Sequence, residues 1–173
     1  MRNYLTLLIY IFISNIILSQ NIIDSIILVK INDYRRSLGL CELIYNTDCY
    51  NAAKLQSKYQ SDNKVIGHSQ KNTTLDTPDK RYISVGGNDI YKNLGEICSF
   101  TPYAIKSNDI NKALKIANKI IDGFKKSPEH NSILIDPNYR YIGISTTEKS
   151  TPTNISNYIR YDISTTILFI DKY

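Results

Sequence analysis

The chain contains few cysteines for its 173 residues, only Cys41, Cys49 and Cys98. This number is too low for a small scaffold held together by disulfide bonds, so a hydrophobic core has to supply most of the stability. An odd number of cysteines leaves at least one thiol unpaired or bonded to another molecule. The sequence does not choose among the possible intramolecular pairings.

A clustered basic surface is also lacking. The formal net charge is +5, but the lysines and arginines are spread along the chain. The lysines between residues 112 and 126 oppose an apolar face at helical spacing, as on the solvated side of an amphipathic helix. No motif that reads nucleic acid is present, and we exclude nucleic acid as a partner.

The longest apolar segment, residues 5–18, is shorter than the about 20 residues that a membrane span needs. Arg2 precedes it and the small Ser19 follows it. This pattern predicts a secretory signal peptide over residues 1–19. An uncleaved anchor is the alternative, because apolar residues continue at positions 22–23.

With the signal peptide removed, no stable membrane span is expected. Residues 20–173 have the length of one domain with a core of its own. We expect this domain to be secreted and extracellular, or periplasmic if the source is Gram-negative.

Helical periodicity predicts a first helix over residues 22–37, which Gly39 stops. Its apolar face consists of Ile23, Ile27, Ile31, Tyr34 and Leu38. A second helix should begin at Asn46, Thr47 or Asp48, any of which can cap its free amides, and end near residue 63. Residues 70–93 form a polar, turn-rich connection with room for one short helix.

A third helix is predicted over residues 108–126, with Ser107 as its cap and an apolar face facing the core. That face consists of Ile110, Leu114, Ala117, Ile121 and Phe124. A short helix over residues 128–134 follows the break at Ser127. Strands are predicted over residues 94–100, 141–147 and 158–170, the last two as an antiparallel pair. These elements make an α+β domain.

The only two histidines stand in short motifs flanked by turns. His68 lies in Gly-His-Ser, His130 lies in Ser-Pro-Glu-His, and a Gly-Glu pair ending at Glu96 stands between them. If the fold brings the three motifs together, two imidazoles and a carboxylate form one pocket. Histidines so far apart in a sequence are otherwise unrelated surface or core residues.

The order of these motifs resembles the CAP superfamily, which unites cysteine-rich secretory proteins, antigen 5 and pathogenesis-related proteins. The resemblance extends from about residue 25 to 145 and is greatest to the short bacterial branch with a single SCP domain. Further motifs that carry it are Asn-Asp-Tyr-Arg-Arg at 32–36, Phe-Lys-Lys-Ser-Pro-Glu-His at 124–130, and Asp-Pro-Asn-Tyr at 136–139.

The resemblance implies an α-β-α sandwich in which a three-stranded antiparallel sheet lies between helices. It also implies a central cleft lined by His68, Glu96 and His130. Two neutral imidazoles and one carboxylate can coordinate zinc or another divalent cation and leave an open position. Without metal, the carboxylate can hold an imidazolium by a charge-assisted hydrogen bond.

The chain departs from the family pattern at several positions. Phe124 stands in place of a tryptophan, and Ser127 stands where larger members carry a second cavity glutamate. Glu129 is adjacent to His130, but neighbouring helical residues point about 100° apart. Ile97 replaces the asparagine that usually follows Gly-Glu. Ser127 and Glu129 therefore remain candidate residues of the cleft beside the three family positions.

Cys98 is a candidate that the family does not supply. If Glu96 lies on a strand, Cys98 lies on the same face two residues later. It could then be a soft metal ligand or a thiol beside the pocket. The alternative is a small buried side chain under the sheet.

Three functions are compatible with these residues. The first is a secreted, non-enzymatic binding domain that takes up a divalent metal, a lipid or small ligand, or an extracellular protein. The second is a metal-dependent hydrolase with Glu96 as general base, although a glutamate that binds the metal is poorly placed for that role. In the third, the histidines only form hydrogen bonds and the surface carries the function. We favour the first and assign no catalytic residue.

Overall fold

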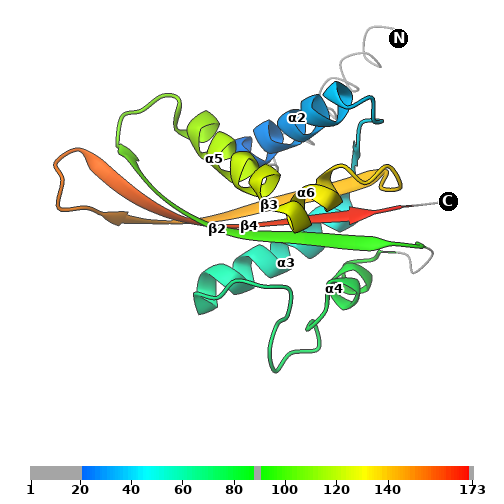
Figure 1. Ribbon diagram of the computed structural model, residues 1–173. Coiled ribbons are helices and arrows are strands. Elements are labelled where there is room, and N and C mark those ends of the chain that lie inside the picture. The colour runs from blue at the N-terminus through cyan, green and yellow to red at the C-terminus, as the bar shows by residue number, and fades with distance from the viewer. Residues whose placement is uncertain (1–20, 88–90, 172–173) are drawn as a thin grey trace, which may run out of the picture.

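A computed structural model of the chain describes residues 21–87 and 91–171. The predicted signal peptide, residues 1–19, lies outside this range. Within it, five helices and a four-stranded sheet follow one another along the chain (Figure 1). They are α2 (Ile22–Ser37), β1 (Ile44–Tyr45), α3 (Thr47–Asn63), α4 (Pro78–Ser84), β2 (Leu94–Lys106), α5 (Lys112–Lys126), α6 (Pro128–Leu134), β3 (Tyr141–Pro152) and β4 (Tyr158–Ile170). No described helix is both long and apolar enough to cross a membrane.

The predicted α+β class is confirmed, but the prediction of a three-stranded antiparallel sheet was wrong. The strand order is β1-β3-β4-β2, and β1 pairs with β3 in parallel through Ile44 and Tyr45. The chain that leaves α2 runs along the free edge of β3, where the amide of Ile44 donates to the carbonyl of Arg140. A strand of two residues has no alternation that a sequence could reveal.

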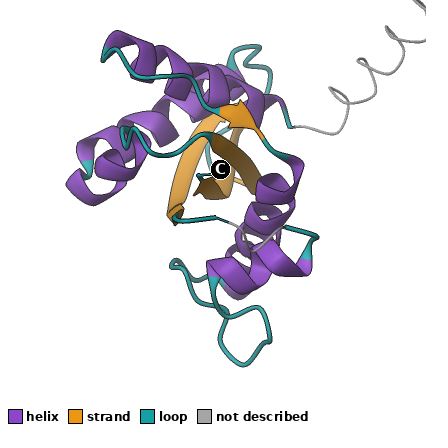
Figure 2. Cartoon of the chain, turned by 90° about the vertical axis from the view of Figure 1, so that its right-hand side faces the viewer, coloured by secondary structure: helices purple, strands orange, loops and turns teal. Residues whose placement is uncertain are grey.

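Helices cover both faces of the sheet, with α2, α5 and α6 on one side and α3 and α4 on the other (Figures 1 and 2). Strand β4 contributes to both cores because successive side chains point to opposite faces. Ile167 and Phe169 lie in the core under α2 and α5, whereas Leu168 and Ile170 pack with α3 and α4.

Capping residues determine where the two long helices begin. The side chain of Asn21 accepts from the amide of Ile23 at the start of α2, and Asn46 accepts from Cys49 at the start of α3. Asn46 was among the three predicted caps of α3. At the other end, Lys64 adopts a left-handed conformation (φ 55°), which directs the chain into the loop that carries His68.

Helix α5 begins at Lys112, so the predicted start at residue 108 was wrong. Asp109 accepts from the amide of Asn111 and from the side chain of Lys115, and these bonds favour a turn over a helix. Ile110 is consequently 95% exposed and does not belong to the apolar face. The buried residues of α5 are Ile116, Ala117, Ile120, Ile121 and Phe124.

Strands β2 and β3 are longer than predicted. The three-stranded extension of β3, β4 and β2 beyond the helices continues to the pairs Lys106 with Tyr158 and Pro152 with Ile159. In this part of β2 one face remains partly buried, because Thr101, Tyr103 and Ile105 alternate with exposed residues, and the strand continues past its predicted end at residue 100.

Candidate functional site

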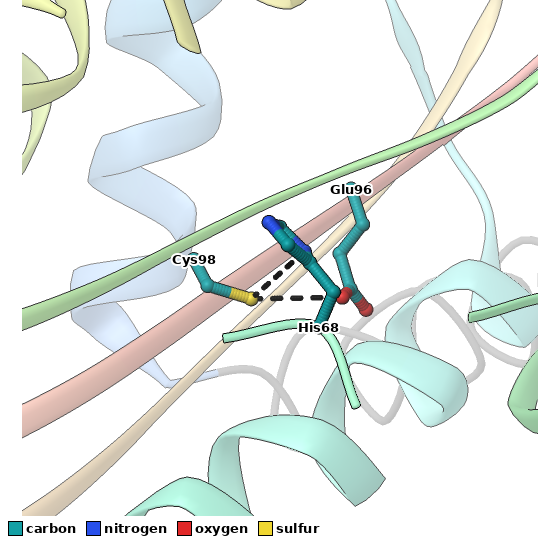
Figure 3. A group of neighbouring side chains, drawn as sticks. All are labelled: His68, Glu96 and Cys98. Atoms are coloured by element: carbon teal, nitrogen blue, oxygen red, sulfur yellow. Dashed lines mark hydrogen bonds and ion pairs between the residues drawn. The ribbon is translucent and has the colours of Figure 1, made fainter. Parts of the chain in front are cut away.

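Three side chains from two segments meet on the α3 side of the sheet. Glu96 and Cys98 lie on β2, and their separation by two residues places them on one face. His68 reaches them from the loop after α3. Figure 3 shows the three side chains pointing toward one another. Their nitrogen, oxygen and sulfur atoms all lie within 4.8 Å of one another.

A hydrogen bond joins His68 Nδ1 to Glu96 Oε1 at 3.0 Å. The side chain of Glu96 is 2% exposed and that of His68 is 54% exposed, so the pair connects the protein interior with solvent. The hydrogen bond to Glu96 raises the pKa of His68, because it stabilises the imidazolium.

Arg81 holds the other oxygen of Glu96. Its Nη2 donates to Glu96 Oε2 at 2.7 Å, and the two side chains are 0% and 2% exposed. Arg81 also donates to the carbonyls of His68 at 3.1 Å and of Leu75 at 3.0 Å. One buried cation therefore neutralises Glu96 and fixes the backbone of the loop that presents His68.

Two glutamines of α3 fix the same loop from the helix. The Nε2 atoms of Gln56 and Gln60 donate to the carbonyl of Gly67 at 2.6 and 2.8 Å. Gly67 has φ 141°, a conformation that favours glycine, and it turns the chain into His68. The position of His68 thus depends on buried polar contacts of the residues before it.

The thiol of Cys98 lies 3.8 Å from His68 Nδ1 and 3.6 Å from Glu96 Oε1. Burial and the negative charge of Glu96 raise the pKa of Cys98 well above its usual range, so the thiol keeps its proton at neutral pH. Ionisation of Cys98 therefore requires a positive charge beside the sulfur to compensate for burial and for Glu96.

His130 lies on α6, outside the group formed by His68, Glu96 and Cys98. It lines a neighbouring pocket of about 400 Å³ together with Cys98 and Ser127. Its ring stands edge-on to Phe124 with the centroids 5.3 Å apart. Burial, and then the charge of nearby His68, lower the pKa of His130 and favour its neutral form.

The remaining candidate residues differ in whether they line this pocket. Ser127 lines it at the junction between α5 and α6. Glu129, one residue before His130, is exposed and is not part of its lining. Cys98 is the one candidate that belongs both to the pocket and to the group around Glu96.

Sequence reasoning missed Arg81, Gln56 and Gln60. Arg81 stands in the polar connection after residue 70, where an arginine is expected at the surface. Gln56 and Gln60 lie four residues apart and share a helical face, which in a sequence has the appearance of a solvated side. Only the contact with β2 and the loop shows that these polar groups are buried.

The donor atoms of His68, Glu96 and Cys98 fit a small divalent cation. A tetrahedral zinc site places nitrogen and oxygen ligands about 3.3 Å apart and sulfur about 3.5 Å from either. The observed separations of 3.0, 3.6 and 3.8 Å agree within a few tenths of an ångström. Three protein ligands would leave one coordination position open.

A family model described as the cysteine-rich secretory protein family (CAP) matches residues 28–159. No curated protein shows significant similarity to the chain.

Several solved structures share the fold. An outer surface protein from Borrelia burgdorferi superposes with a TM-score of 0.60 at 21% identity, covering 86% of this chain and 92% of that protein. An extracellular protein with an SCP domain from Bacillus anthracis gives 0.61 at 17% identity, with 84% of this chain and 39% of that one covered. A cysteine-rich secretory protein from Staphylococcus aureus gives 0.51 at 18%, with coverage of 84% and 37%. The chain therefore spans well under half the length of the last two.

Proposed function

Because the chain belongs to the cysteine-rich secretory protein family, we propose that it is an extracellular binding domain whose cleft takes up a divalent metal ion. His68, Glu96 and Cys98 would be the ligands. The observation that carries this proposal is the convergence of imidazole, carboxylate and thiol within 4.8 Å.

An extracellular location is supported by two observations. Residues 5–18 have the length and flanks of a signal peptide, with cleavage proposed after residue 19 and one domain over residues 20–173. The proteins of similar fold from Borrelia and Bacillus are described as an outer surface protein and an extracellular protein. We propose secretion or surface display for this chain on that basis.

Zinc is the ion that suits this donor set best. A thiolate favours borderline and soft ions, whereas magnesium and calcium prefer oxygen ligands alone. Binding would displace the proton of Cys98, since the thiolate is the ligand form. A bound zinc would supply a positive, Lewis-acidic centre for an anionic group of the ligand.

Binding is favoured over hydrolysis by the contacts of Glu96. With Oε1 as a metal ligand and Oε2 paired with buried Arg81, Glu96 would be poorly placed to accept a proton from water. The remaining alternative is that His68 and Glu96 form a hydrogen bond with no metal. The ligand set predicted from the sequence, with His130 in place of Cys98, is a further alternative.

Isothermal titration with zinc tests the proposal on the wild type and on His68→Ala, Cys98→Ser and His130→Ala. We expect His68→Ala and Cys98→Ser to weaken binding by more than the roughly 10- to 100-fold that loss of an outer-shell partner costs. His130→Ala, the matched control, should bind as the wild type does. Titration in buffers of different ionisation enthalpy should show release of a proton that Cys98→Ser abolishes.

The other outcomes identify the alternatives. Loss of binding in His130→Ala with retention in Cys98→Ser would favour the ligand set of two histidines and Glu96. Equal, weak binding by all four proteins would leave the hydrogen-bonded pair without a metal and reject the proposal.

A further inference from the structure

We propose that the outer edge of β2 beside Cys98 and Phe100 binds an extended, acidic peptide segment of a partner protein by strand addition. This inference rests on the proposed role as a binding domain, but it does not require a metal ion.

Among the described residues, strand β2 is the last strand of the sheet and pairs with β4 alone. Hydrogen bonds at both ends of the β2–β4 pair show which residues of β2 bond to β4 and which face outward. The amide of Asp171 donates to the carbonyl of Asn93, and the amide of Ser107 donates to Asn157. In this register odd-numbered residues of β2 bond to β4, so even-numbered residues direct their amides and carbonyls to the outer edge.

The open part of this edge is short and has defined ends. Pro102 has no amide, and Lys119 Nζ already donates to its carbonyl at 3.0 Å. At the other end, the lining of the pocket stops at Cys98, so Glu96, the next outward-facing residue, lies outside it. Between these ends, the amides and carbonyls of Cys98 and Phe100 have no hydrogen-bond partner among the described residues.

The pocket of about 400 Å³ lies around this edge and not on one face of the sheet. Ile66 reaches it from the α3 side, and Phe124 and His130 reach it from the α5 and α6 side. Residues 98–102 of β2 line it between these walls. Figure 1 shows β2 running between the two helical layers. A segment in the pocket would therefore lie alongside the strand.

Backbone groups at strand spacing select a peptide over an acyl chain. Each amide and carbonyl of Cys98 and Phe100 would pair with an extended backbone, as in other cases of strand addition. A hydrocarbon chain would cover the same groups and leave them unpaired, which costs free energy. The hydroxyl of Ser99, which also lines the pocket, has no partner among the described residues either.

Apolar side chains form the walls on which such a segment would pack. Ile66 is 61% exposed and Phe100 is 46% exposed. Both also line an adjoining hollow of about 420 Å³ between the end of α3 and strands β3 and β4. The two hollows thus form one continuous surface around Ile66 and Phe100.

The charges around this surface favour acidic side chains. Lys119 borders the first hollow, and Lys64, Lys149 and Arg160 border the second. Asp162 in the second lining pairs with Arg160 at 2.9 Å, and Asp62, outside the lining, pairs with Lys149 at 3.0 Å. Lys64 and Lys119 are then the lining cations without a carboxylate partner among the described residues. An acidic partner segment would complement the remaining positive charge.

The test uses a fluorescein-labelled peptide, acetyl-Glu-Val-Thr-Val-Glu-amide, and measures its anisotropy against the protein. We expect saturable binding by the wild type. The same peptide N-methylated at Val-Thr-Val keeps its side chains but loses its donors, and it should bind at least about tenfold more weakly. Replacement of both Glu by Gln should weaken binding several-fold. Equal binding by the N-methylated peptide would overturn the proposal.

A pair of variants separates the backbone from the side chain at Phe100. Phe100→Pro removes an amide that does not bond to β4, so the sheet should tolerate it, as it tolerates Pro102. Phe100→Ala removes the ring and keeps the amide. We expect Phe100→Pro to bind at least about tenfold more weakly than Phe100→Ala. Equal affinities of two folded variants would contradict strand addition.

Hydrogen exchange of the wild type keeps the proposal testable if Phe100→Pro fails to fold. The amides of Cys98 and Phe100 should exchange faster than those of Ile97 and Ser99, and the peptide should slow them at least about tenfold. Slow exchange at Cys98 and Phe100 in the free protein would show that the edge is already covered. A concentration-dependent dimer that protects these amides would place a second copy of the chain at the edge. That result would reject a segment of a partner protein as the occupant.

The metal-binding proposal and the peptide-binding proposal can be rejected independently of each other. We expect peptide binding to persist in EDTA and in His68→Ala, whatever the zinc titration shows. Loss of peptide binding in either condition would make it a consequence of the metal site and reject the edge as an independent determinant.

Discussion

The guanidinium of Arg81 is completely buried and contacts three parts of the chain. It bonds to Glu96 on β2, to the carbonyl of His68 in the loop after α3, and to the carbonyl of Leu75. A buried charge of this kind is tolerated because its partner is an ion and both Nη atoms meet carbonyls, although Nε has no partner among the described residues. It follows that Arg81 contributes to stability and to the position of His68 at the same time.

Arg81→Met should therefore be strongly destabilising. It leaves Glu96 as a buried charge with His68 as its remaining partner, and removal of one member of a buried ion pair costs about 3–5 kcal/mol. Urea unfolding at pH 7 measures the difference. The matched control is Lys80→Met, which removes only an exposed pair with Asp76 and should change stability little. Similar losses in both variants would contradict the role assigned to Arg81.

Asp24 is a second buried acidic residue, on the opposite side of the sheet from Glu96. It is 1% exposed and accepts from Thr146 Oγ1 at 2.7 Å. Burial raises the pKa of Asp24 from its ordinary 3.8 to about 7, with a smaller contribution from the charge of Glu148. The fold thus favours the protonated form of Asp24.

The raised pKa predicts a loss of stability on the alkaline side. Above pH 3.8 the unfolded chain releases the proton while the folded chain retains it, so stability falls until about pH 7 and is constant beyond. The loss for this one group is roughly 4 kcal/mol at most. Asp24→Asn keeps the acceptor for Thr146 and should abolish this dependence. Denaturant unfolding of both proteins from pH 4 to 8 measures it, and parallel curves would contradict the assignment.

At the level of single residues, a sequence points to site residues of rare types and does not distinguish site residues of common types. His68 and His130 are the only histidines, and Glu96 follows a glycine in a recognisable pair. No such signal marks Arg81 among 21 lysines and arginines. Its burial depends on where α4 folds back on β2, which is a property of tertiary packing.

Among the elements, α3 differs from α5 in the chemistry of its buried face. All buried residues of α5 are apolar. The buried face of α3 begins with Cys49, Ala52 and Ala53 and continues with Gln56, Ser57, Gln60 and Ser61. The polar half lies over the site, where Gln56 and Gln60 hold the loop of His68.

The small side chains at the start of α3, those of Cys49, Ala52 and Ala53, allow a close approach of the helix to β3. A Cβ at Gly143 would lie 2.0 Å from the amide nitrogen of Tyr50 and 2.1 Å from the carbonyl carbon of Cys49. Both are backbone atoms that no rotamer change can move. Glycine at this position is therefore a requirement of packing, independent of backbone conformation.

Gly143→Ala should destabilise the fold by at least about 1–3 kcal/mol, because α3 has to shift away from the sheet. Gly123→Ala is the matched control, since nothing lies within 4 Å of its Cβ position in α5. There alanine should stabilise the helix by up to about 1 kcal/mol. Thermal unfolding compares them, and equal changes of the same sign would contradict this account of Gly143.

Elements with strong local signals were predicted well. The predicted bounds of α2 and α6 agree with the structure, because helical periodicity ending before Gly39 marks the first and the Ser127-Pro128 break marks the start of the second. The start of α5 and the existence of β1 were not predictable in this way. In the first case Asp109 makes a competing turn, and in the second the pairing partner lies almost 100 residues away, at Tyr141 and Ile142.

Across the whole molecule, the three thiols lie in separate environments and none is bonded to another. Cys41 is exposed after α2, Cys49 lies in the smaller core under α3, and Cys98 lies at the site. The fold therefore depends on its two hydrophobic cores and on the buried ion pair of Arg81 with Glu96. In an oxidising extracellular environment Cys41 is the thiol open to another molecule.

The reaction rate with a thiol reagent should consequently distinguish exposed Cys41 from buried Cys49 and Cys98. With an aromatic disulfide reagent at neutral pH, we expect one fast equivalent from Cys41 and slow reaction of Cys49 and Cys98, limited by opening of the fold. Cys98 is further protected because burial and Glu96 raise the pKa of its thiol. Cys41→Ser should remove the fast phase and also any disulfide-linked dimer formed in air, while guanidinium should make all remaining thiols react. Two fast equivalents in the native protein would mean that a buried thiol is open to solvent, and a dimer of Cys41→Ser would assign the cross-link to the site or to the core under α3.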